Sequence, residues 1–250
     1  MGALAAPVLA SAAPRAGAPV LAAAFPSDAG DAGRLVAVRA VVFDVGETLV
    51  DETRIWSDWA DWLGVPRLTF LAVVGAMIER TTDHRDPIRL FRPGIDVGAE
   101  QRRRREAGQP VDVVAADLYP DAVPALRAAL DAGYRVGIAA NQPSRIESLF
   151  LDMGLPLDFV AASESWGLHK PDPGFFARIV SELGLPAAEI AYVGDRLDND
   201  VEPAAAAGMA AIFIRRGPWG WIQAGRSDPP QAAATIDGLG ELPAVLAALG

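Results

Sequence analysis

The chain has 250 residues, 51% of them hydrophobic, so it can bury one large core or a core with an insertion. Its formal net charge of −10 and its pI near 4.7 argue against non-specific binding to nucleic acid or to an acidic membrane surface. Cysteine is absent, and the histidines are His84 and His169 alone. Disulfides, thiolate chemistry and multi-histidine metal sites are therefore excluded.

Residues 1–34 form an Ala/Pro/Gly-rich tract with little pattern, which we interpret as a disordered tail or an over-extended gene start. A signal peptide over Ala3–Ala13 is the alternative, but no basic residue precedes this stretch and Pro7 interrupts it. No apolar run reaches the about 18 residues that a membrane helix requires. We therefore expect a cytoplasmic protein without a membrane partner.

The first strand is predicted over Val36–Phe43, because Val41–Phe43 are β-forming residues without polar interruption, typical of a strand buried on both faces. Asp44 follows at the strand's end, and Gly46 allows the backbone to turn close to a ligand. A carboxylate there can be a metal ligand, a nucleophile or a general base, and Thr48 can direct its hydroxyl to the same point. The plain alternative is a turn-forming Asp-x-Gly.

Residues 54–117 are predicted to form a helical insertion outside the sheet. Arg54–Leu63 carries three tryptophans at helical spacing, which we interpret as the core of a small helical unit rather than a ligand cage. Pro66 is expected to open a second helix that runs to Arg80, since proline suits a first helical position. A short helix and loops follow, and the four arginines at 102–105 predict a solvated helix face.

From Leu118 onward, apolar strands alternate with helices that end at glycines. Strands are predicted over 134–140, 159–162, 190–193, 211–214 and 235–236, and helices over 122–132, 144–153, 173–183, 201–207 and 242–249. Asp121 is a candidate N-cap, and 215–219 is predicted to be a loop. The alternation implies right-handed crossovers between parallel strands. The predicted fold class is α/β, a Rossmann-like parallel sheet with helices on both faces over 35–53 and 118–250, plus an inserted all-helical cap.

Several predicted strand ends carry polar residues: Asp44, Asn141, the segment before Lys170, and Asp195. The carboxyl ends of parallel strands lie at one edge of a sheet, so these side chains are expected to meet there. Asp200 adds a further acid in the loop after Asp195. Carboxylates gathered at one edge repel each other unless a hard divalent cation neutralises them, and Mg²⁺ fits because it prefers oxygen ligands. Lys170 supplies a fixed positive charge nearby.

In order and spacing, these segments resemble the motifs of the haloacid-dehalogenase (HAD) superfamily of hydrolases. Asp44–Thr48 matches the family's Asp-x-Asp-x-Thr/Val pattern except in its third place, and Lys170–Pro173 matches Lys-Pro-Asp-Pro in full. Gly194–Asp200 matches Gly-Asp-x-x-x-x-Asp. The resemblance covers roughly residues 37–216, and 54–117 falls where the family inserts its C1-type cap.

The resemblance implies a Mg²⁺-dependent phosphatase. Asp44 would be the nucleophile, attacking phosphorus to give an aspartyl-phosphate that water then hydrolyses. Mg²⁺ would be held by Asp44, the backbone carbonyl of Gly46 and Asp195, with Asp200 acting around the ion or through water. Lys170 would neutralise the nucleophile and the phosphoryl oxygens.

Two departures from the family pattern stand out. Gly46 replaces the acid that protonates the leaving group in family phosphatases, and since a positioned acid contributes ~10²–10⁴-fold, we expect slow turnover. Glu47 is the nearest replacement acid, and Asp51 is another. Ala140 stands where the family has a Ser or Thr that binds a phosphoryl oxygen, and Asn141 or the backbone amides of the next helix start are the candidate substitutes.

Three functions remain open. The first is a phosphatase of a small phosphorylated metabolite, because a C1-type cap closing over the site favours a small substrate. The second is a metal-independent dehalogenase in which Asp44 attacks carbon; Gly46 allows this, although the retained Asp195 and Asp200 favour a metal. The third is a degenerate member that binds a phosphorylated ligand or a protein, which Gly46 and Ala140 favour. No pattern in the sequence reveals the oligomeric state or the substrate.

Overall fold

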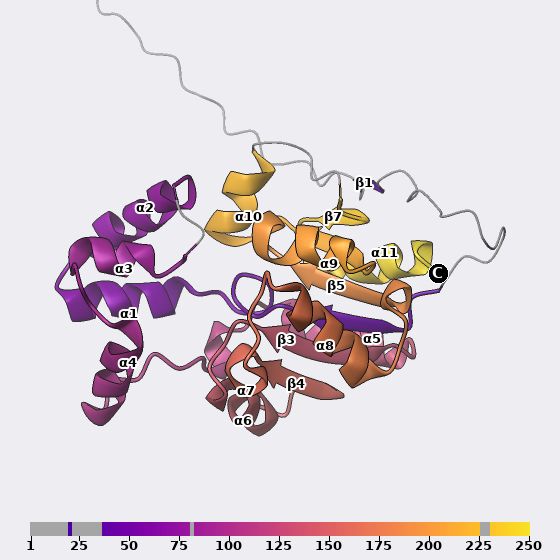
Figure 1. The fold of residues 1–250 in the computed structure, drawn as a ribbon, viewed down its shortest axis with the longest axis horizontal. Helices are drawn as coiled ribbons and strands as arrows, with labels where there is room; N and C mark the ends of the chain where they lie inside the picture. Colours follow the sequence, from indigo (N-terminus) through magenta and orange to yellow (C-terminus); the bar gives the residue numbers. More distant parts are fainter. Residues whose placement is uncertain (1–19, 22–36, 81–82, 226–230) are drawn as a thin grey trace, which may run out of the picture.

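The computed structural model describes residues 20–21, 37–80, 83–225 and 231–250 (Figure 1). The tail predicted over 1–34 therefore lies outside the described residues, apart from Val20–Leu21, which form a two-residue strand. The two residues 81–82 in the helical segment also lie outside them.

One mixed sheet organises the fold, and its order is β1-β7-β6-β5-β2-β3-β4. Its strands are β1 (Val20–Leu21), β2 (Ala40–Phe43), β3 (Arg135–Ala140), β4 (Phe159–Ala162), β5 (Ile190–Gly194), β6 (Ala210–Ile214) and β7 (Ala234–Ile236). Neighbouring strands from β7 to β4 pair in parallel, and β1 alone pairs antiparallel. The strand order reverses direction at β2, between β5 and β3, so β2 ends at the point where open α/β sheets bind ligands.

Helices cover both faces of this sheet, which confirms the predicted fold class (Figure 1). One face packs against α5 (Ala122–Asp131), α6 (Arg145–Asp152) and α11 (Leu242–Ala248), and the other against α8 (Pro173–Leu183) and α9 (Glu202–Ala206). The alternation of strand side chains builds both cores. In β2, Val41 and Phe43 join the first core and Ala40 and Val42 the second, all fully buried.

A helical unit lies between β2 and α5 in the chain and to one side of the sheet (Figure 1). It consists of α1 (Thr53–Leu63), α2 (Arg67–Ile78), α3 (Asp86–Phe91) and α4 (Val97–Glu106). Trp56, Trp59 and Phe70 bury their rings in a core separate from those of the sheet, as the tryptophan spacing predicts. That this unit is a C1-type cap stays a prediction.

No single helix among the described residues is long and apolar enough to cross a membrane. The pair α1 and α2 meets the requirement of length and composition only when taken together, and a bend of 115° separates the two helices.

The prediction of a solvated arginine face over 102–105 is wrong for Arg104. Its side chain is buried, and its guanidinium lies 4.9 Å from the ring centroid of Trp59 and 5.2 Å from that of Trp62. The planar, weakly hydrated guanidinium stacks on aromatic faces, so a basic residue can enter an aromatic core that sequence patterning assigns to apolar groups.

The loop predicted over 215–219 is right for residues 215–216 and wrong from Gly217 onward, where α10 (Gly217–Ala224) begins. Gly217 has φ of +62° and allows the turn into the helix, and the fixed φ of Pro218 suits the first helical turn. A second short helix that was not predicted, α7 (Ser163–Trp166), follows β4. The single-turn helices η1 (Ala115–Asp117), η2 (Ala187–Glu189) and η4 (Leu239–Glu241) complete the connections.

Asp121 precedes α5 as predicted, but its side chain does not cap that helix. Its carboxylate instead accepts hydrogen bonds from the guanidinium of Arg216 and from the backbone N–H of Leu239 at 2.9 Å. The candidate N-cap therefore joins three distant segments, because a charged guanidinium competes successfully with the helix N–H groups.

Truncating Leu126 of α5 tests the core beneath the sheet. This side chain is fully buried, so Leu126→Ala is expected to lower the free energy of unfolding by about 2–5 kcal/mol through lost burial and the cavity it leaves. The matched control is Leu151→Ala on α6, whose side chain is 70% exposed. Urea denaturation measures both variants, and equal losses would contradict the assigned packing.

Candidate active site

The ends of the two central parallel strands bring Asp44 and Asp195 together. Phe43 of β2 pairs in register with Val193 of β5, and the Asp44 backbone N–H donates to the Val193 carbonyl at 2.9 Å. Each aspartate directly follows its strand, so the shared register places both side chains at one edge of the sheet. Both are buried.

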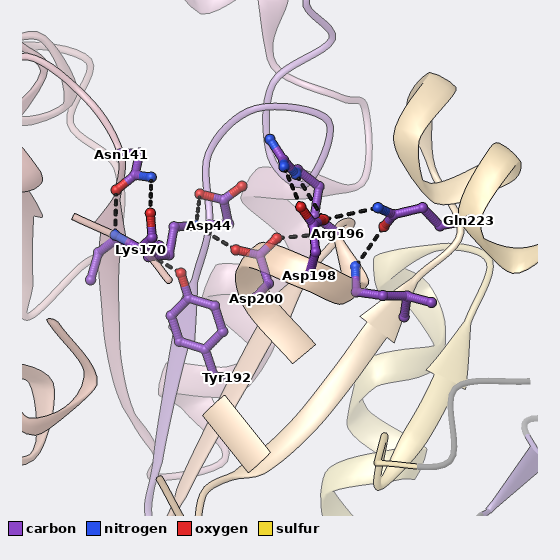
Figure 2. Close-up of polar contacts among 10 residues, drawn as sticks. Asp44, Asn141, Lys170, Tyr192, Arg196, Asp198, Asp200 and Gln223 are labelled. Carbon is purple, nitrogen blue, oxygen red and sulfur yellow. Dashed lines mark hydrogen bonds and ion pairs between the residues drawn. The ribbon is translucent and has the colours of Figure 1, made fainter. Parts of the chain in front are cut away.

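Lys170 joins this edge from the segment before α8, and its side chain is completely buried (Figure 2). Its Nζ donates to Asp44 Oδ1 at 2.6 Å and to Asp200 Oδ1 at 2.5 Å. Tyr192 of β5 lies beneath it, with the ammonium 5.4 Å from the ring centroid. A buried ammonium between two carboxylates is the charge-assisted arrangement that offsets the desolvation of all three groups.

Asn141 holds the backbone of Lys170 and also lines the cavity beside it. Its Nδ2 donates to the Lys170 carbonyl at 2.9 Å, and its Oδ1 accepts from the Lys170 N–H at 2.8 Å (Figure 2). The two bonds engage both polar atoms of the amide. Asn141 thus belongs to the predicted site, and the contacts described here give it a positioning role.

Asp200 reaches the site because Gly194 leaves room for it. A Cβ at Gly194 would come within 2.5 Å of the Asp200 side chain, so no larger residue fits there. The chain from Leu197 to Val201 forms one π-helical turn, the kind of local irregularity that is frequent at functional sites. The Arg196 backbone N–H donates to Asp200 Oδ2 at 3.0 Å and fixes the carboxylate.

Helix α10 braces the same loop, and sequence reasoning missed its contribution (Figure 2). Gln223 donates to Asp198 at 2.8 Å and accepts from the Leu197 N–H at 2.7 Å. Arg196 pairs with Asp198 at 2.6 Å and stacks 3.8 Å above the ring centroid of Trp219. No sequence signal marked these partners, since Trp219 fell in the predicted loop over 215–219 and no element was predicted around Gln223.

Asp44, Asp195 and Asp200 each offer a carboxylate oxygen within 4.8 Å of the others. Burial raises the pKa of Asp195 well above its usual value, and the neighbouring Asp200 and Asp44 add to the shift. Burial also raises the pKa of Asp200 to about 6, although Lys170 opposes the change. Burial alone would lower the pKa of Lys170, but Asp200 and Asp44 outweigh it and hold that pKa well above its usual value.

This set of donors fits a hard divalent cation. Three buried carboxylates face one ammonium, so negative charge is in excess, and all the available side-chain ligand atoms are oxygens. The backbone of Gly46 lies two residues after Asp44 at the same strand end, where its carbonyl is a candidate ligand.

Glu47, the predicted replacement acid, has φ of +54°, and neighbouring groups hold its carboxylate. The Tyr119 hydroxyl donates to it at 2.5 Å and the Glu52 N–H at 3.1 Å. Burial raises its pKa. The other candidate acid, Asp51, accepts from the Thr53 N–H at 2.8 Å at the start of α1.

Thr48 is fully buried, and among the described residues its Oγ1 has no hydrogen-bond partner. Its backbone carbonyl accepts from Arg216 at 3.1 Å. Direct contact between this hydroxyl and a substrate, as the sequence predicts, stays a prediction.

Glu52 is a further acid that sequence reasoning did not single out. Its carboxyl lies over Gly46, where an added Cβ would come within 2.6 Å of Glu52 Oε1. Burial raises the pKa of Glu52 to about 8, and the nearby Glu47 adds to the shift. A glutamate six positions after Gly46 was visible in the sequence, but only the turn between β2 and α1 returns it to that glycine.

A cavity of about 800 Å³ opens between the helical unit and the carboxyl edge of the sheet. The helical unit contributes Glu52, Trp56, Trp59, His84, Ile88 and Gln101 to its lining, and the sheet side contributes Asn141, Arg145, Lys170, Arg196 and Asn199. Burial lowers the pKa of His84 to about 4, so this imidazole is neutral at neutral pH. Lys170 connects the cavity to the buried carboxylates.

The fold and this edge define an α/β protein with a carboxylate centre at the end of β2. Residues 38–208 match the haloacid dehalogenase-like hydrolase family, which is most of the chain, and the chain belongs to that family. It is therefore a hydrolase.

Curated relatives with named activities include phosphatases. The chain is 28% identical over 204 residues to glyceraldehyde 3-phosphate phosphatase of Methanopyrus kandleri, covering 72% of this chain and 85% of that protein. It is 30% identical over 135 residues to phosphoserine phosphatase of Thermus thermophilus, covering 52% of this chain and 54% of that protein. Most of the other curated matches span about half of each protein or less. The match to phosphoglycolate phosphatase of Rhodospirillum rubrum, for example, covers 46% of that protein.

Solved structures share the fold. A haloacid dehalogenase-like hydrolase from Bacteroides fragilis superposes with a TM-score of 0.62 at 25% identity, covering 82% of this chain and 99% of that one. A HAD phosphatase from Thermococcus onnurineus superposes with a TM-score of 0.55 at 24% identity, covering 84% of this chain and 98% of that one. A 2-haloacid dehalogenase from Pseudomonas syringae superposes with a TM-score of 0.55 at 22% identity, covering 85% of this chain and 100% of that one. The fold alone therefore does not separate a phosphatase from a dehalogenase.

Removing the ammonium of Lys170 tests the charge balance of the site. Lys170→Met leaves Asp44 and Asp200 buried without their cation, so the free energy of unfolding in a chelator is expected to fall by about 3–5 kcal/mol. The control is Arg178→Gln on α8, whose ion pair with Glu182 is half exposed and contributes less than about 1 kcal/mol. Similar unfolding midpoints for Lys170→Met and the wild type would refute the pairing.

Proposed function

We propose that this chain is a Mg²⁺-dependent phosphatase that hydrolyses a small phosphorylated metabolite through an aspartyl-phosphate on Asp44. The observation that carries the proposal is the convergence of Asp44, Asp195 and Asp200 within 4.8 Å. The buried ammonium of Lys170 bridges two of them, Asp44 and Asp200. Named phosphatases among the relatives support the same reaction class.

Asp44 is the nucleophile in this proposal. One of its oxygens is held by Lys170, and the carboxylate is nearly buried at the end of a rigid central strand. A fixed carboxylate attacks phosphorus without first having to be oriented, which is the main contribution of positioning to such reactions. Lys170, whose high pKa keeps it charged, then stabilises the negative charge on the phosphoryl oxygens.

Asp44, Asp195 and the Gly46 carbonyl would hold the Mg²⁺ ion, with Asp200 beside them. When bound, the ion supplies positive charge that draws the phosphoryl oxygens toward Asp44 and lowers their repulsion with its carboxylate. Lys170 and the Arg196 backbone N–H keep Asp200 in place for this set.

A small substrate suits the cavity, because the helical unit covers the carboxyl edge of the sheet and leaves about 800 Å³. Trp56, Trp59 and Ile88 give this cavity an apolar wall, while Arg145 and Arg196 give polar contacts. The substrate's phosphate would lie at Lys170 and its remaining part toward the helical unit.

Replacing the nucleophile tests the reaction. Wild-type protein is expected to release inorganic phosphate from at least one member of a panel of phosphorylated metabolites when Mg²⁺ is present, and Asp44→Asn is expected to lose this activity by at least about 10³-fold. Phosphate release is measured with and without a chelator. Halide release from 2-haloacids without metal would instead favour the dehalogenase, and it would refute the proposal.

Mg²⁺ binding is tested separately from turnover. Mg²⁺ at about 100 times its Kd is expected to raise the free energy of unfolding by about 2.7 kcal/mol, and Asp195→Asn to lose most of that gain. The matched control is Asp152→Asn, an exposed aspartate at the end of α6. Thermal unfolding gives the readout. Stabilisation by Mg²⁺ without turnover of any panel member would favour a degenerate, ligand-binding protein.

A further inference from the structure

Position 46 is a glycine because another side chain occupies its space. The three atoms nearest to an added Cβ all belong to the Glu52 carboxyl, with Oε1 at 2.6 Å, Cδ at 2.9 Å and Oε2 at 3.4 Å. The backbone itself does not require glycine, since Gly46 is outside the set of residues with positive φ. The Glu52 carboxyl therefore lies where the side chain of residue 46 would otherwise be.

Two contacts hold Glu52 in this place. Its backbone N–H donates to Glu47 at 3.1 Å, which fixes the turn between β2 and α1, and Trp56 Nε1 donates to Oε2 at 3.0 Å. Trp56 is itself buried in the core of the helical unit. The carboxyl is thus anchored through Oε2, while Oε1 is the oxygen nearest to Gly46.

Glu52 also lines the cavity that reaches Lys170, whereas Glu47 does not. The Glu47 carboxylate is bound by Tyr119 and packs against Gly217, where an added Cβ would come within 2.4 Å of it. Of the two glutamates, Glu52 is the one that lines this cavity, and its carboxyl lies over Gly46, two residues after Asp44.

We propose that Glu52 is the general acid–base residue of this hydrolase, acting from the start of α1 in the space that Gly46 leaves open. The inference rests on the proposed phosphatase function and adds a catalytic residue to it.

The proton balance of the reaction follows from this placement. As Asp44 forms its bond to phosphorus, the bond from phosphorus to the leaving oxygen breaks, and the Glu52 proton passes to that oxygen to give the free alcohol. Glu52 then accepts a proton from the water that attacks phosphorus. The bond from phosphorus to Asp44 breaks, which releases inorganic phosphate and restores both side chains.

The decisive variant is Glu52→Gln, compared on two kinds of leaving group. On the alkyl phosphate that the panel identifies, kcat/KM is expected to fall by about 10²–10⁴-fold, since an alkoxide departs poorly without a proton. On 4-nitrophenyl phosphate, kcat/KM is expected to fall by less than about tenfold, because nitrophenolate departs as a stable anion. The ratio kcat/KM reports only the steps up to the aspartyl-phosphate, so it isolates the acid from the later base.

A rescue variant places the acid back on residue 46. Glu52→Ala removes the obstructing carboxyl, and adding Gly46→Asp to it is expected to recover at least about tenfold of the lost kcat/KM on the alkyl phosphate. Gly46→Asp alone brings its side chain against Glu52 and is not expected to raise the rate. The control Glu182→Gln, on the exposed face of α8, is expected to leave both substrates unaffected.

The outcomes separate the two proposals. Wild-type protein without phosphatase activity on any substrate refutes the proposed function. Active wild type with a Glu52→Gln variant that slows both leaving groups equally overturns the role of Glu52 alone. If Glu47→Gln shows the leaving-group dependence instead, the acid is Glu47, as the sequence first suggested.

Discussion

The ammonium of Lys170, enclosed between Asp44 and Asp200, is the interaction on which the site depends. Burying one charge is costly, and burying three is tolerable only when they compensate each other at hydrogen-bond distance. That requirement explains why neighbouring side chains hold the backbone of Lys170 in place. Asn141 clamps the main chain of Lys170, and Tyr192 lies under its ammonium.

The carboxylates are also held in place, by the strands that carry them and by helix α10. The register between β2 and β5 sets Asp44 and Asp195 side by side, and Gly194 admits Asp200 to the same point. Helix α10 then braces the loop between them through Gln223 and Trp219. A site with excess negative charge needs such external bracing, because its own groups repel each other until a cation is present.

The structure changes the interpretation of the glycine at position 46. From the sequence it signalled a lost acid and slow turnover, whereas in the fold it provides the space that the Glu52 carboxyl fills. Glu52 immediately precedes α1, and Trp56 of the same helix binds it. The proposed acid is therefore tied to the helical unit that also forms one wall of the cavity, so movement of that unit would move the acid with it.

Local pattern alone determined the α/β fold and the residues of the carboxylate edge, because apolar runs, glycine-terminated helices and polar strand ends are short-range signals. It failed where a distant partner decided the outcome. Arg104 is buried against two tryptophans, and Asp121 binds Arg216 instead of capping α5. Residues 217–224 form a helix that contacts the loop after β5. The place of Glu52 belongs to the same group, since spacing along a chain carries no information about which side chain a turn returns to a glycine.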